Sequence, residues 1–161
     1  MDRCPDELLA PFAAAKSAMN DAPTDDADIV DSVYTPEGIR EEETVIGQQF
    51  DQFQAVVAVH EATGEVAALT EVYVSMQPHR SHQGDTAVVA AHRGSGLGLW
   101  VKADMLLRLR AERPDVAELL TGNSATNAHM LRINDRLGYR PYAVHLGFQL
   151  AVTGKPVDAA G

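Results

Sequence analysis

The fold is decided by the stretch Ala91-His92-Arg93-Gly94-Ser95-Gly96-Leu97-Gly98-Leu99. An apolar run before it predicts a strand over residues 85–90, and an amphipathic segment after it predicts a helix over residues 97–113. The chain therefore passes from a strand through three alternating glycines into a helix. Such a turn presents backbone N–H groups, with the N-terminus of a helix behind them, to an anion. We expect this loop to bind a phosphate-bearing molecule.

The glycine spacing excludes two common phosphate-binding loops. A P-loop continues with Lys and then Ser or Thr after its last glycine, and no such pair follows these glycines. A dinucleotide-binding loop has the pattern Gly-x-Gly-x-x-Gly, but counting from Gly94 and Gly96 places the third glycine at Leu99. The spacing that is present is Arg93-x-x-Gly96-x-Gly98. A plain strand-to-helix turn is the alternative, and three alternating glycines behind an arginine disfavour it.

The whole sequence predicts one mixed α/β (α+β) layer domain over residues 1–152, with a frayed tail over 153–161. Periodicity and turn residues predict the element order ααβββαβαβ. The predicted elements are residues 6–18, 36–48, 53–60, 66–75, 85–90, 97–113, 116–121, a helix that ends near residue 137, and 142–152. Ser124 or Asn123 is expected to cap the last helix, and Gly138 to end it.

Composition excludes several classes of function. The 161 residues carry a formal net charge of −10, with sixteen Asp and Glu against four Lys and Arg in residues 1–80. An acidic chain disfavours binding to nucleic acid, and no apolar run has the length of a membrane span. Cys4 is the only cysteine, so no internal disulfide can form and a cytoplasmic location is expected. His79 and His82, in a predicted polar loop over residues 77–83, predict no metal site because no cysteine is near.

At the residue level the sequence resembles the GNAT superfamily, the acyl-CoA-dependent N-acyltransferases. Arg93-x-x-Gly96-x-Gly98 after a strand is similar to the pyrophosphate-binding motif of that family. A second block, with Asn123, Asn127 and the ending Arg136-Leu137-Gly138-Tyr139, resembles the family's next strand and helix. Residues 92–139 are most similar to the second domain of tandem two-domain GNAT proteins. The family's usual first strand has no counterpart before the first predicted helix.

The resemblance implies a place for acetyl-CoA. It implies that the strands over 85–90 and 116–121 splay apart and that acetyl-CoA lies in the V-shaped gap between them. Pantetheine amides would pair with the backbone near Val88 and Val89, and an N–H near Val89 would polarise the thioester carbonyl. Arg93 is expected to contact the ligand. The pyrophosphate would lie on the N–H groups of Gly94, Ser95, Gly96, Leu97, Gly98 and Leu99.

The expected reaction is direct transfer of the acetyl group to a small primary amine in a ternary complex. The family commonly protonates the departing thiolate with a tyrosine, and that position here is Asn134, which can bond the sulfur but cannot donate a proton as an acid. Tyr139 and Tyr142 are the substitutes, although Tyr139 also suits an aromatic plug after the helix. A thiolate with a pKa near 8.5 can also leave without enzymic protonation.

The general base has two candidates. The glutamate that some members use falls near Gln83, which cannot accept a proton. Asp85 is expected on the same strand face as Gln83, and Glu71 lies inside an apolar strand, where a carboxylate needs a reason. Glu71 ranks slightly ahead, and each of them taken singly also suits a solvent-facing strand position.

Two other functions remain open. A degenerate CoA-binding or dimerisation module is favoured by Asn134 and by the missing first strand, which would leave a sheet edge open to pairing with a second copy. A nucleotide-binding domain would require ATP to compete with CoA for the glycine loop. Asn123 suits helix capping and cofactor binding equally well, and Asn127 belongs to the same block.

Overall fold

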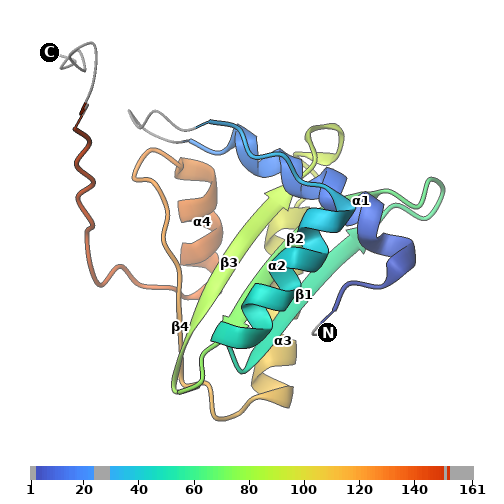
Figure 1. Cartoon of the computed structure of the whole chain (residues 1–161). Coiled ribbons are helices and arrows are strands. Elements are labelled where there is room, and N and C mark those ends of the chain that lie inside the picture. The colour runs from blue at the N-terminus through green and yellow to red at the C-terminus, as the bar shows by residue number, and fades with distance from the viewer. Residues whose placement is uncertain (1–2, 24–29, 151, 153–161) are drawn as a thin grey trace, which may run out of the picture.

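A four-stranded sheet with helices on both faces forms the centre of the molecule (Figure 1). This computed structural model describes residues 3–23, 30–150 and 152. In spatial order, the strands are β1 (Gln52–Val59), β2 (Val66–Val74), β3 (Arg80–Val88) and β4 (Glu118–Leu120). The first three pair antiparallel, and β4 joins β3 in parallel. The sheet is therefore mixed, as the sequence predicts.

The helices form a layer on each side of this sheet. One face is covered by α1 (Asp6–Lys16), the 3₁₀ helix η1 (Ser17–Asp21) and α2 (Pro36–Gln49), and α3 (Leu97–Glu112) covers the other. The last helix, α4 (Ala128–Leu137), lies beside β3 and contacts α3 (Figure 1). A 3₁₀ turn, η2 (Ala90–His92), leads from β3 into the glycine loop. None of the helices in the described ranges is long and apolar enough to cross a membrane.

The core explains why β2 is almost continuously apolar. Leu69 packs with Phe12 of α1 on one face, and Val72 packs with Met105 of α3 on the other. A strand covered on both faces needs apolar residues at successive positions instead of an alternating pattern. Burying each such side chain contributes about 1.5–3 kcal/mol, so β2 anchors both layers.

The register between β2 and β3 shifts at one point. Thr70 lies opposite Thr86, but Val72 lies opposite Gln83, so two residues of β3 are accommodated opposite Glu71. This is a β-bulge, which adds a residue to one strand and reverses the facing of the side chains beyond it.

The bulge contains Gly84 and Asp85. A Cβ atom on Gly84 would lie 2.3 Å from Cε2 of Tyr73, so only glycine fits there without displacement. Asp85 consequently faces α1, where its carboxylate lies 3.4 Å from Nζ of Lys16, whereas Gln83 faces the α3 side. The expectation that Gln83 and Asp85 share a strand face is therefore wrong, because the bulge separates them.

The two parallel strands separate as expected. β3 and β4 pair only where Arg80, Ser81 and His82 lie opposite residues 118–120. β3 then runs on to Val88 without β4 beside it, so the two strands are paired at one end only. Residues 80–83, which the sequence predicts as loop, are strand because they find backbone partners on both sides.

The predicted last strand is wrong for the described residues of 142–152. Residues 139–150 have no regular secondary structure, and apolar side chains at alternate positions, such as Val144, Leu146 and Phe148, are exposed. Because β4 is three residues long, this edge of the sheet offers few backbone partners. The predicted tail over 153–161 lies outside the described residues.

Candidate active site

The three glycines of the loop each meet a geometric demand. Gly94 and Gly96 have φ of 81° and 83°, in the left-handed region that other residues rarely adopt. A Cβ on Gly98 would lie 3.3 Å from Cδ1 of Ile133 and 3.4 Å from Cγ2 of Val88, so a small residue keeps α3 close to both neighbours.

The glycine loop leads into the N-terminus of α3, which has no side-chain cap. Gly96 is the N-cap residue, and its carbonyl oxygen accepts a hydrogen bond from the N–H of Trp100 at 3.1 Å. By helix geometry, the N–H groups of Leu97, Gly98 and Leu99 precede this bond and have no partner within the helix. They form the positive end of the α3 dipole, which favours an anion.

Arg93 connects the loop to two other segments through its side chain. Its Nε donates to the carbonyl oxygen of Val88 at 3.0 Å, and its guanidinium pairs with the carboxylate of Asp21 in η1. This arginine therefore bridges the end of β3 and the end of η1, and it remains partly exposed.

The free edge of β3 directs backbone N–H groups toward the gap. The N–H of Val89 donates to the carbonyl of Ala67 in β2 at 3.0 Å, so it is already used. In an antiparallel pair the alternate residues point away from the partner strand, which directs the N–H groups of Thr86 and Val88 toward the gap. Of the N–H groups near Val89, the one that the register directs toward the gap is therefore that of Val88.

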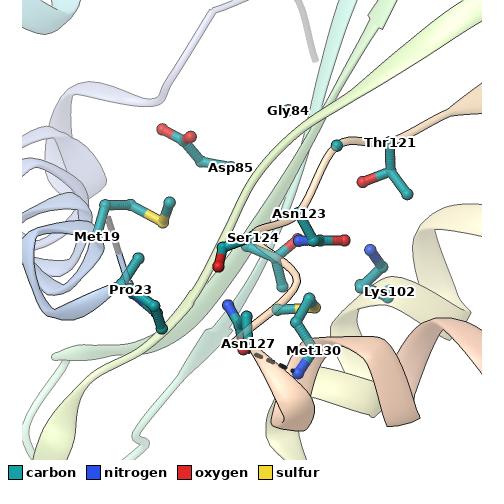
Figure 2. Close-up of a pocket in the computed structure, with 13 residues that line it drawn as sticks. Met19, Pro23, Gly84, Asp85, Lys102, Thr121, Asn123, Ser124, Asn127 and Met130 are labelled. Atoms are coloured by element: carbon teal, nitrogen blue, oxygen red, sulfur yellow. Dashed lines mark hydrogen bonds between the residues drawn. The ribbon is translucent and has the colours of Figure 1, made fainter. Parts of the chain in front are cut away.

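A cavity of about 220 Å³ lies in the gap (Figure 2). Gly84, Asp85 and Thr86 of β3 form one wall, and the loop over residues 121–124 forms the facing wall. The other lining residues come from η1 and the residues after it, from α3 and from the start of α4: Met19, Ala22, Pro23, Lys102, Asn127 and Met130.

A buried ion cluster lies behind Asp85. Lys16 is 1% exposed, and its Nζ lies 3.0 Å from Glu71, 3.2 Å from Glu42 and 3.4 Å from Asp85. Burial alone would lower the pKa of Lys16, but the three carboxylates outweigh it and hold that pKa above its ordinary value. Burial raises the pKa of Glu71 to about 7, although Lys16 acts in the opposite direction. Glu71 is thus held by a lysine, and Asp85 is the member that borders the cavity.

A second polar group lies around Lys102 and Asn134. Nδ2 of Asn134 donates to Oδ1 of Asn123 at 2.7 Å, and Oδ1 of the buried Asn134 has no hydrogen-bond partner among the described residues. Nζ of Lys102 lies 5.1 Å from the centroid of the Tyr139 ring. The Tyr139 hydroxyl donates to Oε1 of Gln83 at 3.2 Å, and burial raises its pKa to about 12.

Comparison with known proteins supports the fold assignment. No protein-family model and no curated protein matches the sequence. A tandem GNAT protein from the clavulanic acid biosynthesis pathway matches with a TM-score of 0.70 and 27% identity, over 88% of this chain and 40% of that one. The chain has the GNAT fold. It spans less than half the length of that tandem protein.

Two further GNAT-fold matches are full-length. An acetyltransferase of Trypanosoma brucei matches with a TM-score of 0.66 and 14% identity, over 92% of this chain and 97% of that one. An aminoglycoside 6'-N-acetyltransferase in complex with a bisubstrate analogue containing CoA matches with a TM-score of 0.61 and 12% identity, over 91% of this chain and 93% of that one.

The GNAT fold brings some predicted site residues together and separates others. Asp85, Asn123 and Asn127 border one cavity, and Asn127 also caps α4 by accepting from the N–H of Met130 at 3.1 Å. The expected cap at Ser124 or Asn123 is therefore wrong, because α4 starts later. The loop residues over 93–99 lie at the α3 end of the gap, apart from this cavity's lining.

Sequence reasoning missed Lys102 and Lys16 as site residues. Lys102 lies on the buried face of α3, in helical spacing with Gly98, Val101 and Met105. The available signal was a lysine on an apolar helical stripe, where a charge is rare unless it is paired or used.

Proposed function

We propose that the protein is an acetyl-CoA-dependent N-acetyltransferase that acts on a small primary amine by direct transfer in a ternary complex. One domain, over residues 1–152, carries this function. The observation that supports it most is the gap between β3 and β4. An uncapped helix N-terminus and glycine loop lie at one end, and a polar cavity lies farther along it.

The residues present fit CoA. The N–H groups over residues 94–99 suit its diphosphate, because the glycines keep side chains away from the anion. The N–H of Val88 points into the gap, where it can hold the thioester carbonyl oxygen as charge develops on it. Bound acetyl-CoA supplies the activated acetyl group. Arg93 holds the carbonyl of Val88 and so orients this end of β3.

Asp85 is the general base that the geometry favours. Its side chain borders the cavity and is 33% exposed, so solvent or a substrate amine can reach it. An alkylamine is mostly protonated at neutral pH and must lose a proton before it attacks. Glu71 is 1% exposed and held by Lys16, so it supports the cluster instead of meeting the substrate. The carboxylates around this wall suit an acceptor that carries positive charge.

The test is calorimetry with CoA on two matched glycine variants. Gly96→Ala places a side chain at a φ of 83° in the loop, and Gly64→Ala imposes the same kind of strain, at a φ of 72°, in the β1–β2 turn. Each costs about 1–2 kcal/mol of backbone strain. We expect Gly96→Ala to weaken CoA binding at least tenfold and Gly64→Ala to leave it unchanged.

Release of free thiol from acetyl-CoA in the presence of a panel of cationic amines then tests transfer itself. The proposal predicts amine-dependent release by the wild-type protein. Tight CoA binding without transfer to any amine would support a CoA-binding module instead, and absence of CoA binding would reject both.

A further inference from the structure

Lys102 is a buried cation that pairs with no carboxylate of the described residues. Its side chain is 1% exposed, yet it contributes to the wall of the cavity. In the described ranges, 3–23, 30–150 and 152, no carboxylate pairs with its Nζ and no side chain or carbonyl accepts a hydrogen bond from it. Its one observed partner is the face of the Tyr139 ring.

The groups around Lys102 are polar, and not all of them have a hydrogen-bond partner among the described residues. Asn134 is hydrogen-bonded to Asn123, and Asn123 lines the cavity. Oδ1 of Asn134 is buried and has no hydrogen-bond partner in the described chain. Figure 2 shows the nitrogen end of Lys102 directed toward Thr121 and Asn123. A buried ammonium and a buried amide oxygen are both costly when unpaired. Lys102 lines the cavity, where a polar ligand group can reach it, and Asn134 is joined to that lining by its hydrogen bond to Asn123.

We infer that Lys102 donates the proton to the thiolate that leaves the thioester, a role that Asn134 cannot perform. This inference rests on the function proposed above. As the C–N bond forms and the C–S bond breaks, Nζ of Lys102 gives its proton to the sulfur, which takes the bonding electron pair. Asp85 accepts the proton that the amine nitrogen loses, and solvent returns a proton to Lys102.

The pKa values of Lys102 and Tyr139 favour Lys102 as the proton donor. Burial lowers the pKa of Lys102 to about 8, which is near the value of about 8.5 for a free thiol. Proton transfer is efficient when the two pKa values are close. The Tyr139 hydroxyl is a much weaker acid and is already bonded to Gln83. Among the described residues of the lining, Asp85, across the cavity, is the one other ionisable group, and it remains available as the base.

The first test measures the ionisation of CoA bound to the protein, by ultraviolet absorbance of the thiolate. We expect wild-type protein to lower the pKa of the bound thiol and Lys102→Gln to return it toward the free value. Lys102→Arg keeps the charge and should retain the lowered value. Arg108→Gln, on the exposed face of α3, is the control and should behave as wild type.

The second test separates charge from proton donation. Because an arginine does not give up its proton near neutral pH, we expect turnover to fall at least tenfold in both Lys102→Gln and Lys102→Arg, with CoA affinity retained. The wild-type kcat should decline above about pH 8, as Lys102 loses its proton. Normal turnover and an unchanged thiol pKa in Lys102→Gln would overturn the role of Lys102 while leaving the proposed function intact.

If Lys102→Gln does not fold, the dependence of the wild-type kcat on pH tests the role of Lys102. A decline in kcat above about pH 8 supports the inference, and a flat profile through pH 10 overturns it. Failure of wild-type protein to bind CoA would instead reject the proposed function together with this inference.

Discussion

Two lysines in the described chain are almost fully buried, and their partners give them opposite properties. Lys16 has three carboxylates around its Nζ, which hold its pKa above the ordinary value. Among the described residues, Lys102 has only the ring of Tyr139 as a partner, and burial lowers its pKa to about 8. The first arrangement fixes α1 onto the sheet. The second leaves a cation available to a ligand, which is the pattern of a functional group.

At the scale of single residues, Asp85→Asn tests the general base. We expect kcat to fall by about 10²-fold or more, because general base catalysis typically contributes about 10²–10⁴-fold. CoA affinity should not change, since the proposed diphosphate site lies at the other end of the gap. The measurement is steady-state thiol release together with calorimetry.

The control for that experiment is Asp104→Asn, which removes a half-buried carboxylate of α3 paired with Arg108. It should leave both kcat and CoA affinity as they are. If Asp85→Asn retains full kcat, the base lies elsewhere, and Glu71 becomes the residue to replace next.

At the scale of elements, local chemistry made most of the fold predictable. The helix at Pro36 begins where Oγ1 of Thr35 accepts from the N–H of Gly38 at 3.0 Å, and α4 ends at Gly138 with φ of 89°. Such caps depend on a few neighbouring residues, so the sequence revealed the end of α4 at Gly138, although it placed the N-cap too early. The glycine loop was predictable for the same reason.

Features that depend on distant partners could not be predicted. The first residues of β3 are strand because β4 lies beside them, and the bulge opposite Glu71 depends on how β3 is registered against β2. Lys102 was visible on an apolar stripe, but its lack of a counter-ion became evident only when the surrounding elements were placed. The side chains around the cavity were therefore the hardest part to predict.

The segment after α4 gives a prediction at the same scale. Phe148 is 94% exposed and Leu146 is also exposed, so Leu146→Ser and Phe148→Ser should each change the free energy of unfolding by less than about 0.5 kcal/mol. Met105→Ala, in the core, should cost about 2–5 kcal/mol. Urea denaturation measures all three.

The opposite outcome for this segment is equally informative. A loss of about 2 kcal/mol or more in Phe148→Ser would mean that residues 142–152 pack as the strand that the sequence predicts, and the arrangement after Gly138 would need revision.

At the scale of the whole molecule, the charges are unevenly distributed over the sheet and its two helical layers. The acidic first part of the sequence forms α1, η1 and α2 over one face of the sheet, while Arg93 and Lys102 lie on the loop and helix of the other part. An anionic ligand is favoured at the glycine loop and a cationic amine at the acidic side. The gap between β3 and β4 connects the two regions.

The most direct test of the account is the change in backbone amide NMR shifts when CoA is added to the wild-type protein. The account predicts one bound CoA, with the largest shifts at the amides of residues 94–99 and at Val88, and little change at Gly64 in the β1–β2 turn. Absence of binding, or shifts that leave residues 94–99 unaffected, would contradict it.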